Sequence, residues 1–451
     1  MSLVNLTAMK RVLADAESCV MAGKVTRVTG IVLEAVLPQV AVGTSCEVRT
    51  ATGQLITAEV VGFSDAKAIL MPFGDLKGIG EGCPVIPRAS AGEIMVGESL
   101  LGRVVSAAME PLDDRGPISL DVRVPLNTAA PRAMSRKRIS RPLVLGIRSI
   151  DSCLTCGEGQ RLGIMSGPGI GKSVLLGMLA RSADADVIVV GLVGERGREV
   201  REFVERDLGS GLARSVVVVA TGDESPLVRV RAGMAATAVA EYFRDKGKRV
   251  LLLIDSLSRV AMAQREIGLA AGEPPTSRGY PPSVFAMLPR LVERAGNCEG
   301  AGSITAMYTM LAEGDDLTDP VVDAGRAALD GHIVLSRSLA MAGHFPAVDI
   351  LASVSRVMTD VVNAEHKELA RRVRDVLSAY KDAADLVEVG AYVAGTNPRV
   401  DAALRCIHEL NTFLRQEPTE RFALAETLTR LRRALDGKPI AQPKVQEERR
   451  A

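Results

Sequence analysis

The segment Ser166-Gly-Pro-Gly-Ile-Gly-Lys-Ser173 combines the residue types and spacing needed to hold the phosphates of a nucleotide. An apolar, strand-like run precedes it and a helical stretch follows it, which is the context that a phosphate-binding loop requires. Its glycines let backbone N–H groups turn toward an anion, and the helix N-terminus adds the positive end of its dipole. We predict that Lys172 reaches the β- and γ-phosphates and that the Ser173 hydroxyl ligates Mg²⁺. The predicted nucleotide-binding residues are Gly167, Pro168, Gly169, Ile170, Gly171, Lys172, Ser173 and Val174.

Asp255 ends a second apolar run, residues 250–254, and is the candidate for a further magnesium ligand. Ligands bind outside the carboxyl ends of parallel strands, so we expect Asp255 at that edge, on a strand neighbouring the loop. By itself, an aspartate after an apolar strand is more often a turn or capping residue. The glycine-rich loop favours the metal role.

Hydrolysis also needs a group that polarises water. Glu195 lies just past the apolar run 187–193, in the sequence Gly194-Glu-Arg-Gly-Arg-Glu199. A carboxylate there could face the γ-phosphate and accept a proton from the attacking water. Acidic residues also favour helix starts, so spacing alone leaves a catalytic role and a solvated helix start equally open. Ser256 follows Asp255, so a glutamate directly after the strand aspartate is absent, and Glu195 is the well-placed candidate.

Phosphoryl transfer also benefits from a cation that is supplied late, often by a neighbouring subunit. Arg356, in the sequence Ser353-Val-Ser-Arg356, could provide it. Spacing alone favours a surface ion pair instead.

Apolar runs alternate with helical stretches over residues 96–360, a pattern typical of a mostly parallel sheet covered by helices. The expected strands are 160–165, 187–193, 215–220, 249–254, 303–310 and 332–336, and the expected helices include 172–181, 197–208 and 227–245. Because these strands are expected to be parallel, the residues that follow them, including the phosphate loop, Glu195 and Asp255, would lie at one edge of the sheet.

Three other zones flank this region. Leu3, Leu6, Met9 and Leu13 recur at helical spacing, so residues 1–22 are expected to contain a short amphipathic helix. Residues 23–95 contain short alternating runs broken by Gly and Pro, which predict a small β-barrel or a sandwich. Residues 361–436 have helical periodicity, and 437–451, with prolines and a run of charges, are expected to form a flexible tail.

Composition narrows the classes of function. Lys plus Arg number 55 against 54 Asp plus Glu, and there is no Trp, so a nucleic-acid-binding surface is not expected. The longest apolar runs fall well short of the ~18 residues of a membrane span. The N-terminus lacks the features of a signal peptide, and seven Cys over a long chain fit a reducing cytosol. We therefore expect a cytoplasmic protein.

Taken together, the motifs resemble those of the ATPases that energise type III protein export in the flagellum and the injectisome, relatives of the catalytic subunits of rotary ATP synthases. The resemblance covers about residues 23–435, and Ser166 fits it, because export ATPases commonly carry a small residue other than Gly there. The motifs that carry it are Leu154-Thr-Cys-Gly-Glu-Gly-Gln-Arg161, Gly194-Glu-Arg-Gly-Arg-Glu199, Gly279-Tyr-Pro-Pro-Ser-Val284, Gly302-Ser-Ile-Thr305, Asp330-Gly-His-Ile-Val-Leu-Ser-Arg337 and Phe413-Leu-Arg-Gln416.

The resemblance implies a homohexameric ring whose chains have an N-terminal β-barrel, a RecA-like P-loop core and a helical C-terminal domain. It implies that Glu195 is the catalytic glutamate, that Arg356 is an arginine finger reaching the next subunit, and that Phe345 packs on adenine. The loop around Tyr280 would line the central pore. One departure is the stretch Ser106-Ala-Ala-Met109, where the family usually has a glycine-rich turn.

The function that the resemblance implies is Mg²⁺-dependent ATP hydrolysis that releases chaperones and unfolds export substrates. The implied partners are a stator or regulator protein, the export gate and chaperone–substrate complexes, at the inner face of the cytoplasmic membrane. The pairing of Gly395-Thr-Asn-Pro398 with the Phe413 motif favours the flagellar over the injectisome enzyme. A rotary ATP synthase subunit and a hexameric nucleic-acid translocase remain as alternatives of another class.

Overall fold

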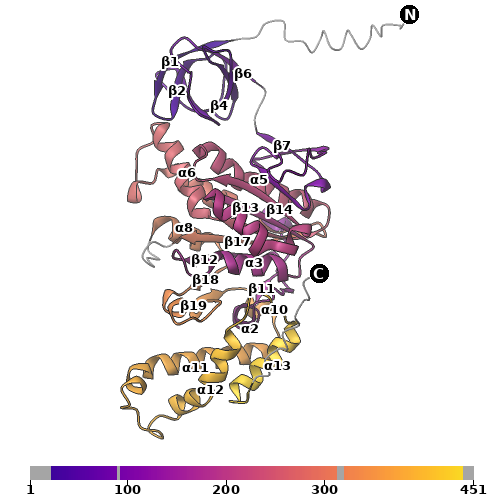
Figure 1. Cartoon of the computed structure of the whole chain (residues 1–451), viewed down its shortest axis with the longest axis vertical. Coiled ribbons are helices and arrows are strands. Elements are labelled where there is room, and N and C mark those ends of the chain that lie inside the picture. Colours follow the sequence, from indigo (N-terminus) through magenta and orange to yellow (C-terminus); the bar gives the residue numbers. More distant parts are fainter. Residues whose placement is uncertain (1–21, 89–91, 312–318, 440–451) are drawn as a thin grey trace, which may run out of the picture.

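The computed structural model describes residues 22–88, 92–311 and 319–439. The chain forms three parts stacked along its long axis, a β-barrel at one end, an α/β domain in the middle and a helical domain at the other end (Figure 1). The helix expected within residues 1–22 and most of the tail expected over 437–451 lie outside the described residues.

The N-terminal strands close into a six-stranded barrel, in the order β1-β2-β5-β4-β3-β6. Alternate apolar side chains such as Val25, Leu33, Val48 and Val85 fill its interior, as the period of two in a strand requires. Pairing of β1 with β6 completes the ring, so of the barrel and the sandwich that the sequence left open, the barrel forms. The strands are β1 (Gly23–Thr29), β2 (Val32–Val36), β3 (Ser45–Arg49), β4 (Leu55–Ser64), β5 (Lys67–Pro72) and β6 (Pro84–Pro87).

The chain enters the central domain through β7 (Glu93–Val96), which pairs with β9 (Val122–Pro125), while β8 (Arg103–Ser106) joins the edge of the large sheet. The turn after β8 forms without a glycine. Met109 takes up the left-handed backbone conformation, with φ of 65°, and its side chain is buried. The Ser106 hydroxyl accepts hydrogen bonds from the N–H groups of Ala108 and Glu110. Burial of the Met109 side chain and these two bonds offset the cost of the left-handed residue.

The central sheet has the order β19-β18-β12-β17-β15-β13-β14-β8, with the short β16 (Gly296–Asn297) beside β17. Neighbours from β18 to β8 are parallel, and the edge strand β19 is antiparallel. The expectation of a mostly parallel sheet is confirmed. The strands not yet given are β12 (Arg161–Ser166), β13 (Val187–Glu195), β14 (Ser215–Thr221), β15 (Arg249–Asp255), β17 (Ser303–Leu311), β18 (Gly331–Leu335) and β19 (Val348–Ser355).

Helices cover both faces of this sheet, and successive side chains of one strand enter two different cores. In β13, Ile188 packs in the core that contains Leu175 of α3, whereas Val189 packs in the core that contains Ala236 of α5. Strands buried on both faces need continuous apolar runs, which is why the sequence shows them. The helices of this domain are α2 (Arg148–Cys153), α3 (Lys172–Ser182), α4 (Gly197–Glu202), α5 (Pro226–Asp245), α6 (Leu257–Ala270), α7 (Pro282–Val292), α8 (Pro320–Ala328), α9 (Arg337–Met341) and α10 (Met358–Val361).

The helix expected over 197–208 changes type along its length, because α4 continues as a π-helix over Phe203–Leu208. Two very short strands, β10 (Pro142–Leu143) and β11 (Cys156–Gly157), pair beside α2. The short helix α2 in turn packs against the C-terminal helices, so it joins the central and C-terminal domains.

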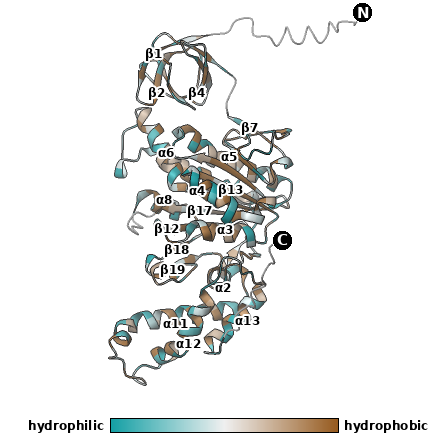
Figure 2. Cartoon of the chain, viewed as in Figure 1, coloured by the Kyte–Doolittle hydropathy of each residue, from teal (hydrophilic) through white to brown (hydrophobic). Residues whose placement is uncertain are grey.

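The C-terminal domain consists of α11 (Ala364–Glu388), α12 (Pro398–Leu414) and α13 (Leu424–Leu435). Each helix is amphipathic, with apolar residues such as Val373, Leu410 and Leu431 packed inside. Figure 2 shows the contrast between these helices, whose colours are mixed, and the brown strands of the central sheet. The C-terminal helical domain that the sequence predicts is thus present as three helices.

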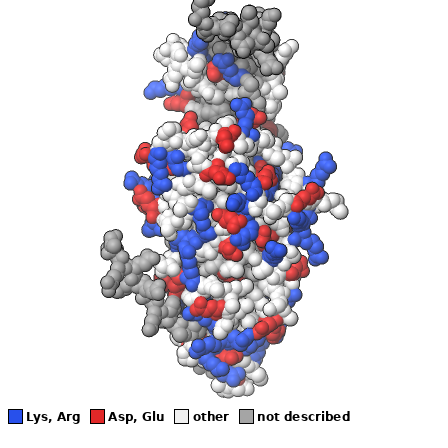
Figure 3. All heavy atoms as spheres, turned by 90° about the vertical axis from the view of Figure 1, so that its right-hand side faces the viewer, with Lys and Arg blue, Asp and Glu red and all other residues white. Residues whose placement is uncertain are grey.

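Positive and negative residues are interspersed on the face shown in Figure 3, with no broad region of a single sign. Among the described residues, no helix combines the length and the apolar character that crossing a bilayer demands.

Candidate functional site

The phosphate-loop segment joins β12 to α3 at the carboxyl edge of the sheet. Gly169 and Gly171 have φ of 76° and 85°, conformations that side-chain-bearing residues rarely adopt. Gly171 is the N-cap of α3 and has no side chain that could bond the first N–H groups of the helix. Those donors and the helix dipole therefore point toward the loop, an arrangement suited to an anion.

Lys172, the first residue of α3, contacts two carboxylates. Its Nζ lies 2.6 Å from Oδ1 of Asp255 and 3.2 Å from Oε1 of Glu195. Burial lowers the pKa of Lys172, but the charges of Asp255 and Glu195 and their hydrogen bonds raise it by more, so the pKa lies above its ordinary value. The lysine is therefore charged at neutral pH, as a phosphate-binding cation must be.

Asp255 ends β15 and is nearly fully buried. Its Oδ1 also accepts a hydrogen bond of 2.7 Å from the hydroxyl of Thr309. Within the described residues, the side-chain hydrogen bonds and ion pair of Asp255 all use Oδ1, so Oδ2 is available to a cation. Those residues contain no cluster of three or more His, Cys, Asp or Glu that would hold a metal by itself.

The sheet order corrects one expectation about Asp255. Its strand, β15, is not next to the loop strand β12, because β17 lies between them. The side chains still meet because α3 leads from β12 to β13 and so crosses over β17 and β15, with Lys172 at its start. The intervening β17 supplies Thr309, a site residue that the sequence does not predict. Its only sequence signal is a polar residue near the carboxyl end of an apolar run.

Glu195 ends β13 in an irregular pairing. The register of β13 against β14 shifts between Val193 and Glu195, and Gly194 there has φ of 74°. Such a bulge turns the strand end and re-aims the residue that follows. A Cβ at position 194 would lie 3.0 Å from the side chain of Arg259, so only glycine fits without displacing that arginine. The bulge directs Glu195 toward Lys172.

A pocket of about 810 Å³ lies beside the loop, within the size range of ligand sites. It is lined by Gly169, Gly171 and Val174 on one side and by Phe345 on another. The ring of Phe345 approaches Gly171 so closely that an added Cβ there would lie 3.3 Å from two ring carbons. Phe345 is 45% exposed, an aromatic face open to a flat ligand.

The far wall of this pocket comes from the C-terminal domain, through Gln416 and its neighbours. The backbone N–H of Gln416 donates to the carbonyl of Phe345. Its side-chain oxygen accepts from the N–H of Arg148, and its Nε2 donates to the carbonyl of Gly146. The guanidinium carbon of Arg148 lies over the ring of Phe422, 4.7 Å from its centroid. Arg148 and Gln416 were not assigned to the site from the sequence, although Gln416 ends one of the quoted motifs.

Arg356 lies apart from the lysine–carboxylate cluster, just after β19, and is exposed. Its Nη1 donates to the carbonyl of Leu329 at 3.2 Å, and its N–H to the carbonyl of Asp330 at 3.0 Å. The structure therefore brings Lys172, Glu195 and Asp255 together, holds Phe345 against the loop, and leaves Arg356 outside this cluster.

The fold and the loop define a P-loop nucleotide-binding protein with a RecA-like core. Three family models match the chain: the ATP synthase alpha/beta family beta-barrel domain over residues 25–88, the nucleotide-binding domain of the same family over 146–355, and the T3SS EscN ATPase C-terminal domain over 362–433. The three matched ranges thus correspond, in the same order along the chain, to the β-barrel, the central α/β domain and the helical C-terminal domain.

Related proteins match nearly the whole chain. The flagellum-specific ATP synthase of Pseudomonas aeruginosa is 53% identical over 93% of this chain and 94% of its own length. The type 3 secretion system ATPase of Sinorhizobium fredii is 49% identical over 91% of both chains. The solved structure of the assembled ATPase EscN from the type III secretion system of enteropathogenic E. coli superposes with a TM-score of 0.87 at 41% identity, covering 92% of this chain and 100% of that one. The chain belongs to the ATP synthase alpha/beta family, in the branch of flagellum-specific ATP synthases and type 3 secretion system ATPases.

Proposed function

We propose that this chain hydrolyses ATP with Mg²⁺ to drive type III protein export. The observation that carries the proposal is the convergence of Lys172, Glu195 and Asp255 at the N-terminus of α3, beside a pocket with an aromatic wall. The names of relatives that are about half identical over more than nine tenths of the chain support ATP as the substrate.

Each residue has a role that follows from its position. Lys172 and the N–H groups of the loop bind the phosphate oxygens, and Phe345 packs on the base. Glu195 orients the attacking water and accepts its proton. Ser173 and Oδ2 of Asp255 would hold a magnesium ion, which supplies charge neutralisation at the phosphates when bound.

We propose further that the working form is a homohexameric ring, in which Arg356 of one chain completes the site of the next. The exposure of Arg356 and its distance in the fold from the Lys172 cluster support an action across an interface. The structure of the assembled EscN ATPase, and that of EscN in complex with its central stalk EscO, support self-association and a regulatory partner.

The proposed setting is the inner face of the cytoplasmic membrane, where the ring would work with a stator protein, the export gate and chaperone–substrate complexes. We favour flagellar export, since relatives from Pseudomonas aeruginosa, Treponema pallidum and Bacillus subtilis bear the name flagellum-specific ATP synthase. The alternative is injectisome secretion, which the match to EscN favours.

A chromosomal Glu195→Gln substitution in the source organism tests this setting. Flagellar export predicts that flagellar subunits disappear from the culture supernatant and that swimming stops. Glu199→Gln is the matched control, because Glu199 follows four residues later in the first turn of α4, is half-buried and makes only a long contact of 3.9 Å with Arg196. Intact flagella together with lost effector secretion would instead establish the injectisome role.

A further inference from the structure

We propose that Asp330 and Arg161 form a positioning pair for Arg356. The pair attaches Arg356, whose cation acts at the site of the neighbouring chain, to β12, the strand that leads into the phosphate loop of its own chain. The inference rests on the proposed role of Arg356 and goes beyond it, because it assigns residues that do not touch the nucleotide.

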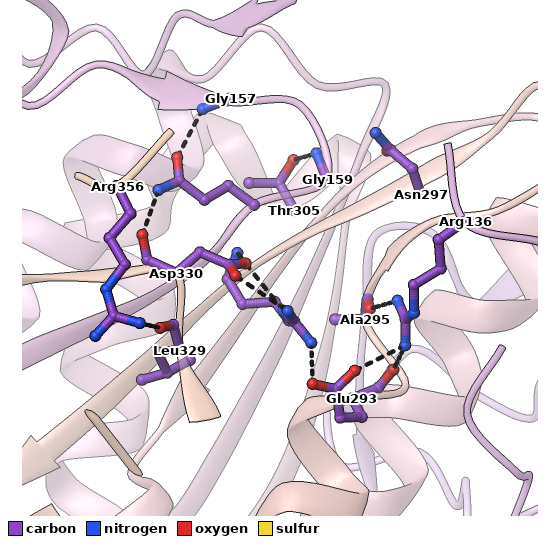
Figure 4. Close-up of polar contacts among 12 residues, drawn as sticks. Arg136, Gly157, Gly159, Glu293, Ala295, Asn297, Thr305, Leu329, Asp330 and Arg356 are labelled. Atoms are coloured by element: carbon purple, nitrogen blue, oxygen red, sulfur yellow. Dashed lines mark hydrogen bonds and ion pairs between the residues drawn. The ribbon is translucent and has the colours of Figure 1, made fainter. Parts of the chain in front are cut away.

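Asp330 connects Arg161, at the start of β12, with Arg356 through both its side chain and its backbone (Figure 4). Its carboxylate accepts three hydrogen bonds from Arg161, from the backbone N–H, Nε and Nη2, each of 3.0 Å. Its backbone N–H donates to the carbonyl of Arg161, and its own carbonyl accepts from the N–H of Arg356 at 3.0 Å. The adjacent carbonyl of Leu329 accepts from the Arg356 guanidinium. Two hydrogen bonds thus hold Arg356 to the carbonyls of Leu329 and Asp330, and Asp330 is in turn held by Arg161.

Gln160, fully buried beside Arg161, adds a second link. Its Nε2 donates to the carbonyl of Asp330 at 3.0 Å and to the hydroxyl of Ser355 at 3.1 Å, the residue before Arg356. Its side-chain oxygen accepts from the N–H of Gly157. Gln160, which precedes β12, and Arg161, which begins it, therefore bind both Asp330 and the residue before Arg356.

The other side of Arg161 is also fixed. Its Nη1 lies 2.6 Å from Oε1 of Glu293, and Glu293 in turn pairs with Arg136 at 3.0 Å. Burial lowers the pKa of Arg161, but Asp330 and then Glu293 raise it by more, so its pKa stands above the ordinary value. Charges alternate along the chain Asp330, Arg161, Glu293 and Arg136, and bidentate arginine–carboxylate pairs are geometrically specific. Glu293 is the C-cap of α7, the helix that begins just after the Tyr280 loop.

These contacts form a short, rigid connection between Arg356 and the phosphate loop of the same chain. Strand β12 begins at Arg161 and ends at Ser166, the first residue of the phosphate loop. A displacement of the loop at one site is therefore transmitted along β12 to Asp330 and Arg356, which act at the next site. Removing the Asp330 carboxylate would leave Arg161 and Arg136 to share the single carboxylate of Glu293, so that one partly buried positive charge is unbalanced. The Arg356 segment would then be free to shift.

The variant Asp330→Asn tests the inference in the assembled ATPase. We expect kcat to fall by roughly 10- to 100-fold with little change in KM for ATP, because a misplacement of about 1 Å costs on the order of 10²-fold. The matched control is Asp113→Asn. Asp113 accepts from Nε and Nη2 of Arg103 and from the N–H of Val104, a similar arrangement at the start of another strand, and also from the N–H of Arg115. Equal losses of kcat in both variants would overturn the proposal in favour of a general structural effect.

Mixed rings separate positioning in trans from damage within one chain. A Lys172→Ala chain cannot hydrolyse ATP but presents an intact Arg356, whereas an Asp330→Asn chain has an intact phosphate loop. We expect their mixture to be more active than the sum of the two alone. If Arg356→Ala recovers activity on mixing with Lys172→Ala but Asp330→Asn does not, the positioning role is wrong and the role of Arg356 stands. If neither mixture recovers, the trans role of Arg356 fails, and this inference with it. Arg161→Lys, which keeps the charge but loses the two-pronged geometry, should behave like Asp330→Asn.

Discussion

Asp255 binds the ammonium of Lys172 through Oδ1 alone, at 2.6 Å, while the same oxygen accepts a bond from Thr309. One carboxylate oxygen is thus committed to the protein, and Oδ2 is the atom that would face a metal. The lysine and the proposed ion share one aspartate, so the charge balance of the site depends on this residue.

Removal of the Asp255 charge is expected to impair the activation of the enzyme by Mg²⁺ while sparing ATP binding. Asp255→Asn should lower Mg²⁺-dependent turnover by roughly 10²-fold or more, because a metal contributes several kcal/mol to the stabilisation of transition-state charge. ATP binding measured in EDTA should survive. Thr309→Val should have a smaller effect, about 10-fold weaker Mg²⁺ activation, since it removes one hydrogen bond and keeps Oδ2. Asp186→Asn, which removes a partner of Arg249 far from the loop, is the control. An unchanged Mg²⁺ dependence in Asp255→Asn would refute the metal role.

The aromatic wall of the pocket predicts how the base is held. Phe345→Ala should weaken ATP binding by roughly 10- to 100-fold, since stacking of one base on an aromatic ring contributes about 1–3 kcal/mol. Binding of inorganic tripolyphosphate should not change, because it has no base, and Phe345→Tyr should keep the affinity for ATP. Calorimetric titration of each variant with both ligands gives the comparison. Equal weakening of ATP and tripolyphosphate would show that the ring shapes the phosphate loop instead.

His344, beside Phe345, predicts a pH dependence of stability. Burial, helped by the charge of Arg415, lowers its pKa to about 4 from a reference value of 6.5. The unfolded chain therefore binds more protons between these values, so the contribution of neutral His344 is complete above pH 6.5 and is lost as pH falls toward 4. The loss amounts to as much as about 3 kcal/mol.

The measurement is the difference in unfolding free energy between wild type and His344→Gln from pH 7.5 to 4. The difference is needed because Asp151, whose pKa burial raises to about 7, contributes the opposite slope. The stability of wild type relative to the variant should fall through this window. A constant difference would mean that His344 is protonated equally in both states.

Exposure of Arg356 predicts that activity depends on assembly. Turnover per chain should rise steeply with protein concentration as rings form, and Arg356→Ala should lower the plateau by roughly 10³- to 10⁵-fold. Activity and mass would be followed across the same dilution series. Activity per chain that stays constant down to monomers would contradict an action across the interface.

Much of the fold was predictable because each buried strand needs a continuous apolar run and each helix start needs its own signals. The parallel core, the helical C-terminal domain and the loop at the start of α3 follow from such local patterns. Whether the N-terminal strands form a barrel or a sandwich does not, because closure depends on the pairing of β1 with β6, about 60 residues apart.

The residues of the site likewise divide into those that local sequence predicts and those that depend on tertiary structure. Lys172, Glu195 and Asp255 each follow or precede an apolar run, so their common edge could be inferred before their contacts were known. Thr309 was missed because the order of strands in the sheet, which inserts β17 between β12 and β15, has no local signature. Gln416 contacts Arg148 across 268 residues of sequence, a contact that only tertiary packing creates.

The central claim is that Glu195 activates water at a site where Lys172 holds the phosphates. The direct test is single-turnover phosphate release by assembled protein with Mg²⁺, with ATP binding measured on the same samples. Wild type should bind and cleave ATP, Lys172→Ala should not bind it, and Glu195→Gln should bind it normally while release slows by roughly 10²- to 10⁴-fold. Phosphate release by Glu195→Gln at the wild-type rate would contradict the account.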